Sequence, residues 1–265
     1  MIDLSKVALV LDIDGVIRDV AGSYRRALAD TVEHFTHQAY RPTPQQIDDL
    51  KAEGVWNNDW EAAQELTRRY FATEGKGGEV VSYEAIVQFF QSRYRGDDPV
   101  HWNGYISQEP LIATPEYFQT LTTAKVAWGF FSGATQGSAS YVLRRLEIQN
   151  PVLVAMEDAP GKPDPTGLFM AIARLESRFD KLDLVIYAGD TVADMITIQK
   201  AREIATNGQN FMAVGVIPPH VQDRQRQAYT DLLKAHGADL VLENILALTP
   251  EAIAQLLAET IRPII

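Results

Sequence analysis

Two aspartates, Asp12 and Asp14, directly follow the short apolar run Val7–Leu11. Side chains two residues apart on an extended chain point to the same side, and carboxylates that close repel each other unless they share a cation or a proton. Ligands of open α/β sheets bind at the carboxyl ends of the strands, where this pair would lie. The pair therefore predicts a site that holds a cation or a shared proton. The simpler alternative is a pair of loop acids that cap or turn the chain.

A second acidic segment follows the apolar run Leu184–Ala188 and contains Asp190 and Asp194. If both runs are parallel strands, these carboxylates lie at the same edge of the sheet as the first pair. Carboxylate oxygens gathered at this density are the hard ligands that Mg²⁺ prefers. Asp190 could also be the N-cap of the helix that begins there, and the two roles are compatible.

Two further segments could handle an anionic substrate. Lys162 lies in the sequence Gly161-Lys162-Pro163-Asp164-Pro165, where the prolines restrict the direction of the chain. Ser132 and Gly133 follow another apolar run and offer a hydroxyl and a backbone N–H to a phosphoryl oxygen. The alternatives are an exposed loop lysine and an ordinary turn from strand to helix.

Short apolar runs alternate with helical patterns through most of the chain, which predicts an α/β protein with a parallel sheet covered on both faces. The predicted strands are 7–11, 126–131, 152–155, 184–188, 211–216 and 240–242. The predicted helices between and beyond them are 115–122, 139–146, 166–176, 194–203, 224–235 and 249–261.

The stretch after the first strand breaks this alternation. It contains four successive helical patterns, 23–38, 43–53, 59–73 and 82–95, with Thr43-Pro44 as a helix cap followed by a first-turn proline. Ser23 is expected to cap the first of these helices. An all-helical block inserted in an α/β core is typical of a lid, so we expect a core domain of residues 1–20 and 105–265 and a helical cap domain of residues 21–104.

The four motifs, in their order and spacing, resemble those of the haloacid dehalogenase superfamily of phosphotransferases, and the helical insert lies where its subfamily IA members carry a type-1 (C1) cap. The resemblance implies a Rossmann-like parallel sheet core, Mg²⁺ and an aspartyl-phosphate intermediate. It makes Asp12 the nucleophile and a metal ligand. Asp14 would protonate the leaving alcohol and then activate water. Ser132 and the N–H of Gly133 would hold the phosphoryl group, and Lys162 would neutralise its charge. The implied metal residues are Asp12, Asp14, Asp190 and Asp194, the last acting through water or by orienting the other ligands.

Asp14 separates the chemistries of this superfamily. Dehalogenating and phosphonate-cleaving relatives do not use an acid at that position, so its presence favours a phosphatase acting on a small phosphate monoester. A sugar phosphomutase is the alternative, because Gly15-Val16-Ile17 followed by Asp19 resembles the first motif of that branch. Residues 50–60 fall where that branch has its specificity loop, but they lack the expected Arg. A non-catalytic binding protein would be expected to lack an essential group, and all of them are present.

The substrate contacts are predicted in the helical insert. Trp56, Asn57, Asn58 and Trp60 combine stacking faces with neutral hydrogen-bonding groups, which suits a sugar or polyol phosphate. The alternative is that the two Trp anchor a helix and that Asn57 or Asp59 caps it. Arg18, with Tyr24, Arg25 and Arg26, could instead bind the carboxylate of a phosphoglycolate-like acid.

The composition limits the remaining function classes. The chain has 265 residues, 46% of them hydrophobic, a formal net charge of -11 and no Cys. An acidic chain without a basic stripe disfavours nucleic-acid binding, and the lack of Cys excludes disulfides and thiolate chemistry. No apolar run approaches the roughly 18 residues that span a bilayer, and no signal peptide is recognisable, so we expect a cytoplasmic protein that binds no membrane.

Overall fold

The computed structural model describes residues 3–53, 55–56, 58–77, 80–179, 181–205 and 208–260. The chain divides into two compact units, the first formed by Met1–Asp19 with Leu111–Ile265 and the second by Val20–Pro110. The second boundary lies at Pro110 rather than at residue 104, because the short 3-10 helix η2 (Tyr105–Gln108) belongs to the second unit.

The first unit is built on a six-stranded sheet in which every pair of neighbouring strands is parallel. The strand order is β3-β2-β1-β4-β5-β6. The strands are β1 (Val7–Leu11), β2 (Ala127–Phe131), β3 (Leu153–Val154), β4 (Leu184–Gly189), β5 (Asn210–Val216) and β6 (Leu240–Leu242). All six lie at the predicted apolar runs, and β1 and β4 are buried along their whole length, which explains their continuous apolar sequence.

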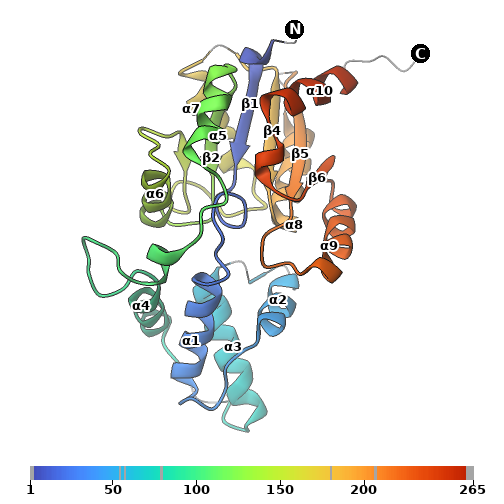
Figure 1. Ribbon diagram of the computed structural model, residues 1–265. Coiled ribbons are helices and arrows are strands. Elements are labelled where there is room, and N and C mark those ends of the chain that lie inside the picture. The colour runs from blue at the N-terminus through green and yellow to red at the C-terminus, as the bar shows by residue number, and fades with distance from the viewer. Residues whose placement is uncertain are drawn as a thin grey trace. The chain divides into compact units, whose positions relative to one another are not determined.

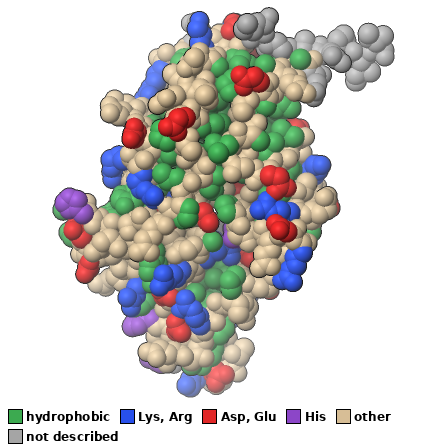
Figure 2. Space-filling model, in the orientation of Figure 1, with side chains coloured by type: hydrophobic (Ala, Val, Ile, Leu, Met, Phe, Trp, Pro, Cys, Tyr) green, Lys and Arg blue, Asp and Glu red, His purple; other side chains and the backbone are tan. Residues whose placement is uncertain are grey.

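Helices cover both faces of this sheet (Figure 1). Leu9 and Leu11 of β1 pack in one apolar layer with α5 (Pro115–Thr123), α6 (Gln136–Arg145) and α10 (Pro250–Thr260). The alternate residues, Ala8 and Val10, pack in the opposite layer with α7 (Thr166–Glu176), α8 (Val192–Ile204) and α9 (Asp223–Ala235). The α/β parallel-sheet fold is therefore confirmed. Figure 2 shows the side of α5 and α10, where hydrophobic side chains reach the surface.

The second unit is helical in its described part. Its helices are α1 (Tyr24–Phe35), α2 (Pro44–Ala52), α3 (Asp59–Thr73) and α4 (Tyr83–Tyr94). Aromatic side chains pack α1 against α4, where the rings of Tyr24 and Tyr94 stack with centroids 4.3 Å apart. Thr43 caps α2 in a capping box with Gln46, as Thr43-Pro44 predicts.

Ser23 precedes α1 as expected, but its hydroxyl does not cap the helix. The backbone of Ser23 is not extended, and its Oγ donates a hydrogen bond to Glu109 instead. An N-cap needs an extended backbone to turn its oxygen toward the helix N–H groups. The residue type of Ser23 alone therefore does not predict a capping hydrogen bond. Among the described helices, none is both long and apolar enough to cross a membrane.

Candidate active site

The site lies where the strand order changes direction. β1 is flanked by β2 on one side and by β4 on the other, and ligands of open α/β sheets bind at such a point. Asp12 directly follows β1, Asp190 directly follows β4, and Leu11 pairs with Ala188. The backbone N–H of Asp12 donates to the carbonyl oxygen of Ala188 at 2.8 Å, which extends the pairing as far as the first acid.

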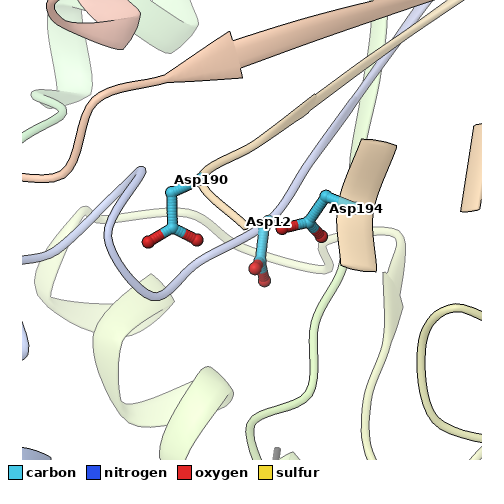
Figure 3. A group of neighbouring side chains, drawn as sticks. All are labelled: Asp12, Asp190 and Asp194. Carbon is cyan, nitrogen blue, oxygen red and sulfur yellow. The ribbon is translucent and has the colours of Figure 1, made fainter. Parts of the chain in front are cut away.

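Asp12, Asp190 and Asp194 form a compact acidic cluster (Figure 3). One carboxylate oxygen from each lies within 4.8 Å of the others, and the residues are 6%, 8% and 0% exposed. The carboxylate of Asp194 reaches from the start of α8 toward Asp12. Three carboxylates this deeply buried need compensating positive charge to remain ionised together.

Lys162 supplies part of that charge. Its Nζ lies 2.7 Å from Asp12 Oδ2 and donates to Asp194 Oδ1 at 2.6 Å. The side chain is 9% exposed, so the alternative of an exposed loop lysine is wrong. Burial alone would lower the pKa of Lys162, but the two carboxylates outweigh burial and raise it above its usual value.

The acids are incompletely neutralised by this one lysine. Burial raises the pKa of Asp12 to about 6, against the attraction of Lys162 and with the repulsion of Asp194. Burial, together with Asp194 and Asp12, raises the pKa of Asp190 well above its ordinary value. A divalent cation would remove this imbalance, and closely spaced carboxylate oxygens are ligands that such hard cations prefer. The residues therefore fit the divalent metal that the sequence resemblance implies.

Each carboxylate oxygen of Asp194 accepts two hydrogen bonds. Oδ1 accepts from Lys162 and from the hydroxyl of Tyr187 at 2.8 Å. Oδ2 accepts from the backbone N and Oγ1 of Thr191, which is the N-cap of α8. The predicted capping role of Asp190 thus belongs to Thr191, and Asp194 is placed to orient Lys162.

Tyr187 is a member of the site that the sequence does not predict. It lies inside the apolar run 184–188, whose pattern predicts only a buried strand, and it is fully buried. Its hydroxyl joins Asp194 to the main-chain carbonyl of Phe131, at 2.8 and 3.3 Å. The signal that could have identified Tyr187 is a tyrosine in a buried strand close to an acidic motif, because a buried hydroxyl requires a polar partner.

Two glycines make the close approach of the acids possible. Gly15 has φ +75, and a Cβ there would lie 2.0 Å from Asp190 Oδ2. A Cβ on Gly189 would lie 2.3 Å from Asp194 Cγ. Any side chain at either position would therefore displace an acid of the cluster.

Ser132 and Gly133 follow β2, the strand that pairs with β1 on its other side. Ser132 is 1% exposed, its Oγ accepts a hydrogen bond from the N–H of Ala134 at 3.2 Å, and Gly133 is exposed. The pairing of Leu11 with Phe130 brings both segments to the edge of the sheet where Asp12 lies. Their binding of a phosphoryl group stays a prediction.

Asp14 and Arg18, two of the predicted site residues, pair with each other. Among the described residues Asp14 lies outside the acidic cluster, and its Oδ1 accepts a hydrogen bond from Arg18 Nε at 2.6 Å. Asp14 as a metal ligand stays a prediction, and its negative charge acts on Asp12 and Asp190. The side chain of Arg18 is fully buried and paired with Asp14, so it is not exposed for the predicted contact with a substrate carboxylate.

The residues predicted to contact substrate from the second unit have local roles. Asn58 is the N-cap of α3, where its Oδ1 accepts from Trp60 N at 2.9 Å, and its Nδ2 donates to the Tyr83 hydroxyl at 3.3 Å. Capping in this segment was foreseen, but for Asn57 or Asp59. Trp56 Nε1 donates to Glu53 at 2.9 Å. Asn57 lies outside the described residues.

Comparisons with known proteins show what this chain is similar to. The chain is 29% identical over 245 residues to a protein from Phytophthora nicotianae named imidazoleglycerol-phosphate dehydratase, which covers 89% of this chain and 50% of that protein. This chain therefore spans about half the length of that curated relative.

Solved structures share the fold at low identity. A phosphatase from Thermococcus thioreducens matches with a TM-score of 0.62 and 20% identity, over 84% of this chain and 99% of that one. A β-phosphoglucomutase from Clostridium difficile matches with a TM-score of 0.55 and 18% identity, over 98% and 99%. The family model for haloacid dehalogenase-like hydrolases matches residues 7–202, a span that contains every member of the acidic cluster and Lys162. The chain belongs to the haloacid dehalogenase-like hydrolase family.

Proposed function

We propose that this protein is a Mg²⁺-dependent phosphatase that hydrolyses a small phosphate monoester through an aspartyl-phosphate intermediate. The observation that carries the proposal is the position of Asp12, whose Oδ2 lies 2.7 Å from Lys162 and whose other neighbours include two buried carboxylates. A carboxylate held beside a buried cation at a strand end is suited to attack a phosphate, because its charge and that of the incoming phosphoryl group are both compensated.

The residues of the chain account for both steps of the reaction. A carboxylate oxygen of Asp12 attacks phosphorus, the phosphorus–oxygen bond to the alcohol breaks, and Asp14 protonates the departing oxygen. Asp14 then takes a proton from water, which attacks the phosphoryl group and releases inorganic phosphate and free Asp12. Throughout, Lys162 offsets the charge on the transferring group, and Ser132 with the N–H of Gly133 binds its oxygens.

Asp12 and Asp190 are the residues that would hold the metal, with Asp194 orienting Lys162 beside them. When bound, Mg²⁺ supplies positive charge that stabilises the equatorial oxygens of the phosphoryl group. It would also lower the pKa values of Asp12 and Asp190, which burial raises in the metal-free protein.

We place polyol phosphates first among the substrate classes. Asp14 suits esters of ordinary alcohols, because an alkoxide leaves poorly without a proton. The relative from Phytophthora nicotianae is named for imidazoleglycerol phosphate, which is itself a phosphate monoester of a polyol. Imidazole-bearing polyol phosphates therefore join glycerol phosphates, sugar phosphates and phosphoglycolate as substrates to test.

A sugar phosphomutase is the second candidate. Gly15-Val16-Ile17 followed by Asp19 is similar to the first motif of that branch, and a solved structure with this fold is a β-phosphoglucomutase. A mutase would hydrolyse its phosphoenzyme slowly and be activated by a sugar bisphosphate.

Phosphate release from this panel, measured with Mg²⁺ and with a chelator, tests the proposal. We expect Mg²⁺-dependent release that Asp12→Asn abolishes. Strong activation by glucose 1,6-bisphosphate together with conversion of one hexose phosphate into another would favour the mutase. Release that survives in Asp12→Asn would contradict the role of Asp12.

A further inference from the structure

The segment between Asp14 and Arg18 is a closed turn. The N–H of Gly15 donates to the carbonyl oxygen of Arg18 at 2.9 Å. The N–H of Arg18 donates to the carbonyl oxygen of Ile13 at 3.1 Å. Asp14 and Arg18 form a backbone bridge, and Arg18 forms a second one with Leu111. These main-chain bonds hold residues 14 and 18 next to each other and leave the turn little freedom.

The side chains of Asp14 and Arg18 pair with each other, but they differ in exposure. Nε and one terminal guanidinium nitrogen of Arg18 both lie 2.6 Å from Oδ1 of Asp14. The Arg18 side chain is fully buried, whereas that of Asp14 is 28% exposed. The arginine is therefore the immobile partner, and the carboxylate is the group with access to solvent and to a ligand.

We infer that Arg18 is a positioning residue for Asp14, which it holds with Oδ1 on the guanidinium and Oδ2 turned toward the substrate alcohol. The inference rests on the proposed function, in which Asp14 is the general acid and base. Catalytic groups must be held close to their productive geometry, and a buried, bonded neighbour is the usual means. In this inference Arg18 acts through Asp14 and not by contact with the reacting atoms.

A merely structural ion pair would have different consequences from a positioning pair. Loss of a structural pair lowers the amount of folded enzyme and affects all substrates alike. Loss of positioning impairs the proton transfer to the leaving oxygen. Esters of poor leaving groups, such as glycerol 1-phosphate, need that proton, whereas the 4-nitrophenolate of 4-nitrophenyl phosphate leaves without it.

The test compares kcat/KM for these two esters in wild type, Arg18→Met and Arg18→Lys, with Mg²⁺ present. This parameter reports the steps up to loss of the alcohol, so the later attack by water does not mask the effect. We expect Arg18→Met to lower kcat/KM for glycerol 1-phosphate about 10²-fold more than for 4-nitrophenyl phosphate, within the usual range of general acid catalysis. Arg18→Lys keeps the charge but not the two-point contact, so its change in the ratio should lie between those of wild type and Arg18→Met.

Arg174→Met is the matched control. Arg174 belongs to the same unit and pairs with Asp158 at 3.5 Å, outside the site. Its replacement should leave the ratio of the two kcat/KM values unchanged. If Arg18→Met proves too unstable to assay, Arg18→Lys decides the question through the same ratio.

A double-mutant cycle with Asp14→Asn completes the experiment. If Arg18 acts through Asp14, Arg18→Met will not change the ratio further once Asp14 is Asn. Equal losses for both esters, or independent effects of the two substitutions, would overturn the inference. Failure of wild type to hydrolyse either ester would instead contradict the proposed function, so the two failures are distinguishable.

Discussion

Glu53 and Asp12 each lie beside a cation, yet their pKa values move in opposite directions. Glu53, in the second unit, accepts hydrogen bonds from Arg69 at 2.7 Å, and these lower its pKa to about 2. Asp12, in the first unit, lies 2.7 Å from Lys162, but burial raises its pKa to about 6. Their partner distances are the same and their surroundings are not.

The two sites differ in how well water solvates their charges. The Glu53–Arg69 pair is about 40% exposed on both sides, so water solvates both ions and the arginine simply favours the carboxylate. In the acidic cluster, Asp12, Asp190 and Lys162 are shielded from water, and Lys162 pairs with only two of the three carboxylates. An incompletely balanced buried charge is costly in the free protein and is available to bind a cation or a phosphoryl group.

The largest expected effect is on catalysis. Asp12→Asn keeps the size of the side chain and removes the nucleophile, so kcat should fall roughly 10⁴-fold or more, as on loss of other nucleophiles. Mg²⁺-dependent phosphate release measures it, with Asp158→Asn, an acid paired outside the site, as the control that keeps activity. Substantial turnover by Asp12→Asn would place the nucleophile elsewhere.

Lys162→Met should produce the largest loss of stability. Without Lys162 the buried acids lose their cation, and breaking a buried pair in this way costs about 3–5 kcal/mol in the free energy of unfolding. Denaturant unfolding in chelator measures the cost, and Mg²⁺ should restore part of it. Glu53→Gln at the exposed pair is the control and should cost much less. Similar losses in the two variants would contradict the distinction between buried and exposed charge.

The pH dependence of stability should follow Asp12. Its pKa is about 6 in the folded protein against an ordinary value of 3.8, so the folded state binds the proton more tightly. This tighter proton binding stabilises the folded state by about 2–3 kcal/mol. The stabilisation is fully present below the ordinary pKa and is lost as the pH rises through about 6. The difference in unfolding free energy between wild type and Asp12→Asn, measured in chelator from pH 4 to 8, reports it. A difference independent of pH would show that Asp12 is ionised normally.

Gly15→Ala should disturb the cluster through the backbone. The residue has φ +75, and the new Cβ would meet Asp190 Oδ2, so we expect a loss of about 2 kcal/mol and weaker Mg²⁺ binding. Calorimetric titration with Mg²⁺ and thermal unfolding measure the two effects. Gly22→Ala, where nothing lies within 4 Å of the added Cβ, is the control. Unchanged Mg²⁺ affinity would argue that Asp190 does not bind the metal.

The smallest effect is expected at Asn58. As the N-cap of α3, it should lose about 1 kcal/mol of stability when changed to Ala and little when changed to Asp, which also caps. Comparing both variants on the substrate panel separates capping from recognition. Asn58→Asp that folds normally but changes substrate preference would support the predicted contact with substrate.

Much of the fold could be predicted because its determinants are local. Strands buried on both faces must be continuously apolar, and runs such as 184–188 match the strands of the structure closely. Thr43-Pro44 predicts a helix start because both residues act within one turn. Ser23 shows the limit, since its hydroxyl found Glu109, far away in the sequence, as a partner.

The site was predictable in its residues but not in its contacts. Asp12, Asp190, Asp194 and Lys162 were all identified from order and spacing, and the structure joins them. Asp14 and Arg18 were both noticed, but their pairing was not, because it depends on a turn that is held by backbone bonds from Arg18 to Ile13 and from Ile112 to Ile17.

The sequence by itself determined the alternation of strands and helices, the helical insert and the acids at the strand ends, because burial and chain spacing act through residue type. Only the tertiary structure decided how the charges are shared: Lys162 between Asp12 and Asp194, Tyr187 on Asp194, and Arg18 on Asp14. The energy of a charge depends on burial and on partners from distant segments, and packing alone establishes both.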